Sequence, residues 1–162
     1  MERLAPVERD CRVAVIGVGQ DLCGDDAVGL RVVRRLKDKL SYRGSVLIVE
    51  GGSAPENVVG VVRRFRPDLV LLVDAGWLNL APGEARLITP EQAAQSSATT
   101  HTLSLAVLAE FLQIDMGCEV VVLVVQVQDV QFGSPVSRAV ELGAAHVVQG
   151  LSAILASCKQ PD

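Results

Sequence analysis

The chain has 162 residues and a formal net charge of -4, and 49% of its residues are hydrophobic but only 3% aromatic. This length suits a single domain, residues 1–162, and a core of Val, Leu, Ala and Ile is typical of buried parallel strands covered by helices. Lys and Arg occur in no run longer than a pair, so no clustered basic field predicts nucleic-acid binding. The longest apolar runs have the length of strands, and the charged N-terminus lacks the apolar segment of a secretory signal. We therefore expect a cytoplasmic protein with no membrane span, and a monomer.

Four cysteines occur without any C-x-x-C spacing: Cys11, Cys23, Cys118 and Cys158. This spacing argues against a zinc knuckle and a disulfide framework, and it suits a reducing compartment. Cys23 lies in a loop of chemical interest, where we expect an ordinary small side chain.

The first half of the chain alternates strand and helix patterns. Strands are predicted over residues 12–17, 45–50 and 68–74, and a short helix over residues 55–65. A longer helix is predicted over residues 26–40, because apolar side chains recur there on one face: Val28, Val32, Val33, Leu36 and Leu40.

The second half continues this alternation. A weaker strand is predicted over residues 84–88, and residues 89–100 form a polar loop with room for one helical turn. A helix follows over residues 101–113, then a buried strand over residues 119–126. Ser134 and Pro135 are typical of a helix start, and this last helix runs to about residue 156. The alternation predicts an α/β fold, an open and mainly parallel sheet with helices on both faces.

Acidic side chains and glycines follow each of the first three predicted strands. The segment GVGQDLCGDD at residues 17–26 follows the first, Glu50 the second and Asp74 the third. Parallel strands end at one edge of a sheet, so we expect these carboxylates to converge there. Converging carboxylates without basic partners either hold extra protons or bind a cation. A simpler interpretation of Asp25 or Asp26 is an acid that stabilises the start of the first helix.

The glycine-rich turn also permits a dinucleotide-binding interpretation. The G-x-G-x-x-G pattern would need glycine at position 22, where Leu22 stands. Asp25 and Asp26 would moreover repel a pyrophosphate at the helix N-terminus. A nucleotide site is therefore the least favoured interpretation.

A histidine is the remaining candidate for this edge of the sheet. His101 follows a polar loop and precedes a helix, although a lone histidine is more often a surface or core residue. His146 has only that simpler interpretation. Two carboxylates and one imidazole suit a first-row ion such as nickel or zinc, and three ligands leave a position open for substrate.

Several segments together resemble the [NiFe]-hydrogenase maturation endopeptidases. They are GVGQDLCGDDAVG, EGGSAPENVV, LVLLVDAG, NLAPGEARLI and the TTH of residues 99–101. The GGSAPEN and RPDLVLLVDA segments and the PGE-TTH spacing are similar to the subgroup that matures hydrogenase 3 of formate hydrogenlyase systems. The resemblance covers roughly residues 12–155.

This resemblance implies an endopeptidase that removes a C-terminal extension from a hydrogenase large-subunit precursor after nickel insertion. It implies Asp26, Asp74 and His101 as catalytic and metal-binding residues, with nickel supplied by the precursor and no nucleotide. It also implies a three-layer α/β/α fold with a twisted five-stranded mixed sheet in the order 2-1-3-5-4 and an antiparallel fourth strand. The sequence departs from the family pattern at Gln20, where asparagine is usual, at Asp21, which is commonly apolar, and at Glu50, often aspartate.

Two rival functions use the same residues. One is a non-catalytic module that docks on the precursor in a nickel-dependent way. The other is a self-sufficient metallohydrolase that holds its own zinc. The sequence does not assign roles to Asp25 and Glu50, nor does it choose between a metal-bound water and an aspartate base.

Overall fold

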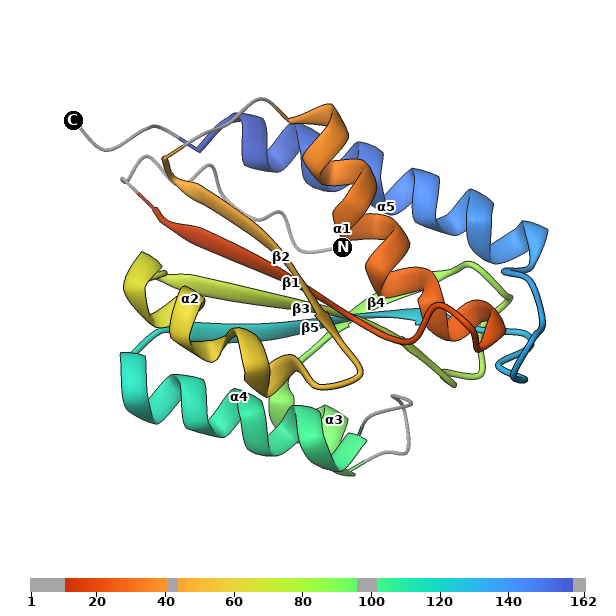
Figure 1. Ribbon diagram of the computed structural model, residues 1–162, viewed down its shortest axis with the longest axis horizontal. Helices are drawn as coiled ribbons and strands as arrows, with labels where there is room; N and C mark the ends of the chain where they lie inside the picture. The colour runs from red at the N-terminus through yellow and green to blue at the C-terminus, as the bar shows by residue number, and fades with distance from the viewer. Residues whose placement is uncertain (1–10, 41–43, 96–101, 159–162) are drawn as a thin grey trace.

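Five strands form one twisted sheet in this computed structural model, which describes residues 11–40, 44–95 and 102–158, with backbone alone at 102–104 (Figure 1). The strand order is β2-β1-β3-β5-β4. Three strand pairs are parallel, and β4 runs antiparallel to β5. The predicted order and the antiparallel fourth strand are therefore confirmed. The strands are β1 (Val13–Val18), β2 (Val46–Gly52), β3 (Leu69–Gly76), β4 (Ala85–Ile88) and β5 (Glu119–Gln126).

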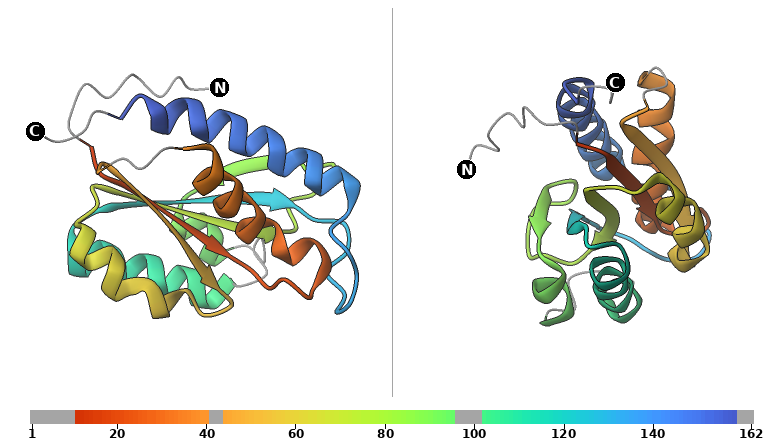
Figure 2. Two further views of the ribbon diagram at one scale, coloured as in Figure 1. Left: turned by 45° about the horizontal axis from the view of Figure 1, so that its top comes forward. Right: turned by 90° about the vertical axis from the view of Figure 1, so that its left-hand side faces the viewer.

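Helices cover both faces of this sheet, as the alternating pattern predicts (Figure 2). One face carries α1 (Val28–Lys39) and α5 (Arg138–Ala156). The other face carries α2 (Val59–Phe65), α3 (Pro90–Gln95) and α4 (Thr102–Met116). Short 3-10 helices lead into the first helix of each face, η1 (Gly24–Ala27) and η2 (Pro55–Val58).

The core consists of two apolar clusters, one on each face of the sheet. Alternate residues of a strand point to opposite faces, so Val15 packs beneath α1 and α5 while its neighbour Ile16 packs beneath α2 and α4. Leu71 and Leu72 of β3 divide in the same way. Because both faces are covered, these central strands carry continuous apolar runs.

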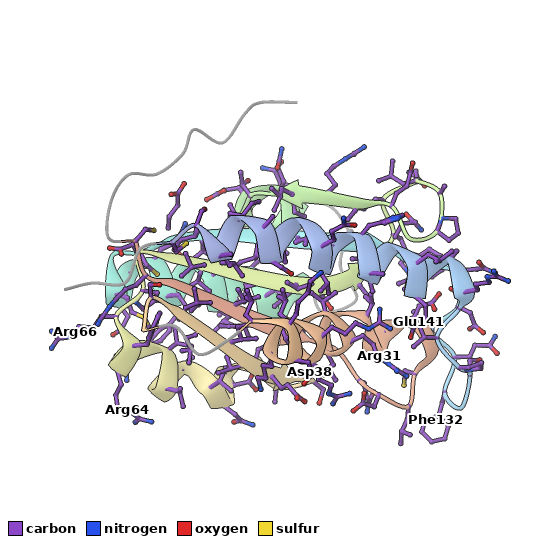
Figure 3. The ribbon with its side chains drawn as sticks, turned by 90° about the horizontal axis from the view of Figure 1, so that it is seen from above. Arg31, Asp38, Arg64, Arg66, Phe132 and Glu141 are labelled. Atoms are coloured by element: carbon purple, nitrogen blue, oxygen red, sulfur yellow. The ribbon has the colours of Figure 1, made fainter. Side chains whose placement is uncertain are left out.

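The first helix has the apolar face that its sequence predicts. Val28, Val32 and Leu36 are fully buried against the sheet. Two of its arginines turn toward α5: Arg31 lies 3.8 Å from the Glu141 carboxylate (Figure 3), and Arg35 also pairs with Glu141. These ion pairs join the two helices of this layer.

Several boundaries differ from the prediction: β2 and β3 run on to Gly52 and Gly76, and α4 runs on to Met116. Two further differences have a local cause. Helix α3 occupies part of the predicted polar loop, and its start is a capping box in which Thr89 and Gln92 each bond the other's backbone N–H, at 2.9 and 3.2 Å. Helix α5 begins at Arg138 after Ser137, and not at Ser134. The reason is that Ser134 N–H donates to the Gln131 carbonyl at 3.2 Å, which closes a turn instead of a helix.

Among the described helices, α5 has the length and apolar composition that a membrane span would need. Its Val140, Ala144, Val148 and Leu155 are buried in the cluster beneath α1 and α5. Core helices of soluble proteins share this composition, so it does not by itself indicate a span.

Candidate active site

The loop between β1 and η1 folds back tightly on itself and thereby fixes Asp26. Gly19 has φ 145°, and a Cβ at this position would overlap the carbonyl oxygen of Asp26. The N–H of Gln20 donates to that carbonyl at 3.4 Å, and the N–H of Asp26 donates to the carbonyl of Cys23 at 3.1 Å. A glycine is required at position 19 because the two chain segments touch there.

The side chain of Asp26 is buried, with 6% of the residue exposed. Its Oδ1 atom has no hydrogen-bond donor among the residues that the structure describes. Burying a carboxylate oxygen without a donor is unfavourable, because the oxygen loses its hydration and gains nothing in return. A donor or a cation that arrives with a substrate would satisfy this oxygen.

Asp74 is fully buried in β3, where it pairs across the sheet with Val124. It shares its strand face with Leu72, which points toward α2 and α4. The elements that carry Asp26 and Asp74 contact each other, since η1 packs on β3. A Cβ at Gly29, at the start of α1, would overlap the Val73 carbonyl next to Asp74. The two predicted aspartates therefore come from adjoining elements at the carboxyl edge.

The predicted histidine, His101, lies outside the described residues. Within the described ranges, no three His, Cys, Asp or Glu side chains are arranged to hold a metal ion. The three-ligand site therefore stays a prediction.

Asp25 has a different environment from its neighbour and is fully buried. Its Oδ2 accepts hydrogen bonds from Gln128 N at 2.8 Å, Asp129 N at 3.0 Å and Ser137 Oγ at 3.0 Å. Its Oδ1 accepts a further bond from Ser137 N at 2.6 Å. The backbone N–H of Asp25 also donates to the Asp129 carbonyl at 2.8 Å. Asp25 thus ties η1 to the loop between β5 and α5, a role that nothing in the sequence pattern indicates.

The prediction that the edge carboxylates lack a basic partner is wrong for Glu50. Arg34 of α1 donates to Glu50 at 2.9 Å and binds both oxygens of Asp21 at 2.7 and 2.8 Å. These hydrogen bonds hold the pKa of each carboxyl below its ordinary value. Arg34 lies well inside the first helix, so no short motif connects it with either acid. Glu50 therefore belongs to an exposed ion cluster.

The environments of Cys23 and His146 indicate no catalytic or metal-binding role. The thiol of Cys23 donates to the side-chain oxygen of Gln20 at 3.3 Å, so the unusual glutamine closes a contact within the loop. His146 is exposed on α5, beside an open groove of about 540 Å³ that residues 82–85 also line. This placement agrees with the simpler interpretation of His146 as a surface residue.

Comparisons with known proteins agree on one family. The sequence model of the hydrogenase maturation protease family, HycI, matches residues 30–154. The hydrogenase 3 maturation protease of Escherichia coli K12 is 36% identical over 135 residues, which are 83% of this chain and 85% of the relative. The crystal structure of the [NiFe] hydrogenase maturation protease HycI from Thermococcus kodakarensis KOD1 has a TM-score of 0.82 at 30% identity, covering 90% of this chain and 93% of that one. The solution structure of the endopeptidase HycI from Escherichia coli has a TM-score of 0.77 at 31% identity, covering 88% and 90%.

Proposed function

The chain belongs to the hydrogenase maturation protease family, in its hydrogenase 3-like subgroup, and from this premise we propose that it cleaves the C-terminal extension from a [NiFe]-hydrogenase large-subunit precursor once nickel has been inserted. Membership makes the protein a hydrolase of peptide bonds that acts on hydrogenase precursors. The proposal adds the place of the cut, the dependence of cleavage on nickel and the residues that bind the metal.

The observation that supports the proposal most is the unpartnered, buried Oδ1 of Asp26. A buried carboxylate oxygen without a donor suits a bound cation, which would supply the interaction that the described residues do not. Nickel on the precursor is such a cation, and here it is part of the substrate.

In this proposal, Asp26 and Asp74 offer carboxylate oxygens to the nickel of the precursor, and His101 offers an imidazole nitrogen. Helix α4 begins at Thr102, and it leads into a strand parallel to β3, so its first turn lies toward the carboxyl edge (Figure 1). The residue before Thr102 is His101, which supports its assignment. One imidazole with two carboxylates makes a modest site for a first-row ion, so we propose that the resting protein holds no nickel tightly.

Binding of the precursor's nickel by these residues would also position the peptide bond to be cut. Once the precursor is held by its metal, water adds to the carbonyl carbon of the scissile peptide and the amide nitrogen leaves with a proton. Either nickel or an aspartate as general base would activate that water. In both routes the reacting bond lies close to the nickel and to the two aspartates that bind it.

The test compares nickel-loaded with nickel-free precursor. Each form is incubated with the purified protein, and the precursor mass is followed by mass spectrometry. We expect loss of the C-terminal extension from the loaded form and an unchanged mass for the nickel-free form. Equal cleavage of both forms would disprove the dependence of cleavage on nickel. Nickel-dependent binding without any change of precursor mass would favour the docking module. A stoichiometric zinc ion that survives dialysis would favour the self-sufficient metallohydrolase.

A further inference from the structure

Two large apolar side chains are exposed beside the candidate site. Leu22 is 61% exposed on the loop that carries Asp26, and Phe132 is 78% exposed on the loop between β5 and α5. The two loops touch, because the N–H of Gly133 donates to the carbonyl of Leu22 at 2.7 Å. Figure 3 shows Phe132 at the tip of its loop, at the carboxyl end of the sheet. We call Leu22 and Phe132 the rim pair.

A hydrogen-bonded turn holds Phe132 outward. The N–H of Ser134 donates to the carbonyl of Gln131 at 3.2 Å, which closes a β-turn with Phe132 and Gly133 at its centre. Gly133 has φ 84°, the value that a type II turn requires at its third residue. The N–H of Gln131 donates in addition to Oδ1 of Asp129 at 2.9 Å.

The rest of this loop is equally well anchored. Asp25 binds the N–H groups of Gln128 and Asp129 at its start and Ser137 at its end. An ordered turn therefore keeps Phe132 exposed to solvent. Because the backbone of this turn is already ordered, a partner that covers Phe132 does not have to order the loop first, and aromatic side chains are often the anchors of protein interfaces.

We propose that the rim pair binds an apolar surface of the hydrogenase precursor next to its scissile bond, and so determines how tightly the substrate is held. This inference rests on the proposed function for the identity of the partner. The position of the rim pair identifies the partner that covers it, because Leu22 lies four residues from Asp26 on one tightly folded loop. Any protein that brings a peptide bond to Asp26 has to cover this loop.

Two other occupants fit less well. A second copy of this chain bound through the rim pair would block the approach to Asp26. An anionic membrane surface would meet the carboxylates of Asp21 and Asp129, which flank the rim pair, and a net charge of -4. The precursor satisfies both the apolar contact and the access to the site.

The test measures kcat and KM for nickel-loaded precursor with Phe132→Ala and Leu22→Ala. We expect KM to rise roughly tenfold for Phe132→Ala and several-fold for Leu22→Ala, with kcat within about twofold. Ile114→Ala is the control, because Ile114 is also 78% exposed but lies near the end of α4, at the opposite edge of the sheet. We expect this control to leave KM and kcat unchanged.

An unchanged KM in both rim variants would overturn the inference, as would an equal rise in KM for the Ile114 control. If Phe132→Ala turns a dimer into a monomer without changing KM, the occupant is a second copy and the inference is wrong. If the wild-type protein binds the precursor without cutting it, the proposed function fails, and the same variants test the rim pair through the dissociation constant. If it neither binds nor cuts the precursor, both proposals fail.

Discussion

Replacing Asp25 with asparagine tests whether this buried carboxylate fastens η1 to the loop that follows β5. The asparagine oxygen can take the position of Oδ2 and keep Gln128 N, Asp129 N and Ser137 Oγ as donors. Its amide group then faces Ser137 N–H, which donates to Oδ1 at 2.6 Å in the native protein. Two donors would meet there, and one buried N–H would lose its acceptor.

The expected loss of stability follows from these contacts. An unsatisfied buried N–H costs about 1–3 kcal/mol, and the three retained bonds each weaken when a charged acceptor becomes neutral. Removing a buried charge offsets part of this loss. We expect the free energy of unfolding to fall by about 2–4 kcal/mol, which lowers the unfolding midpoint by roughly 4–16 °C for a chain of this length.

Urea titration and a thermal scan followed by circular dichroism measure both quantities. Asp38→Asn is the control, because Asp38 is an exposed carboxylate near the end of α1, away from both loops. We expect this control to unfold like the wild type. An unchanged midpoint for Asp25→Asn would refute the view that Asp25 holds the two loops together.

Two further predictions concern the same edge of the sheet. Arg34→Met should reduce the free energy of unfolding by less than about 1 kcal/mol at pH 7 and low salt, because its partners are exposed. Arg34 lowers the pKa of Asp21 and Glu50, so its contribution is complete above their ordinary values of about 4 and is lost as the pH falls through the lower native values. Urea titrations of both proteins at pH 7 and pH 3 should converge at the lower pH, and a difference that grows on acidification would contradict this assignment. Gly19→Ala should abolish precursor processing, because the added Cβ would displace the carbonyl of Asp26. Its control is Gly117→Ala, at φ 63° with open space around it, which should cost about 1–2 kcal/mol of stability and leave processing intact. Equal processing by both variants would show that cleavage does not depend on the tight loop at Gly19.

The sheet and its covering helices could be predicted because each layer has its own pattern in the sequence. Parallel strands buried on both faces read as continuous apolar runs, and α1 repeats Val28, Val32 and Leu36 on one face. Asp74 lies near the carboxyl end of β3, and the rule for ligand sites in such sheets made it a candidate. The order of the strands came from the resemblance to a known family.

The contacts between distant segments could not be predicted. Asp25 and Asp26 are neighbours with the same side chain, yet one is fully hydrogen-bonded by residues more than 100 positions away and the other has an oxygen without a donor. Glu50 is joined to Arg34, which lies on the outer side of a helix. The capping box of Thr89 and Gln92 is instead a local contact, and its T-x-x-Q spacing would have predicted the start of α3.

We propose that Asp26 is kept for the substrate at some cost to the stability of the fold, and Asp26→Asn tests this role most directly. Removing the negative charge from a buried oxygen without a donor should leave the unfolding midpoint unchanged or raise it. The same variant should release no C-terminal extension from nickel-loaded precursor, whereas Asp38→Asn, an exposed site near the end of α1, should process it at the wild-type rate (Figure 3). A wild-type rate of processing by Asp26→Asn, or a midpoint lowered by several degrees, would contradict this role of Asp26.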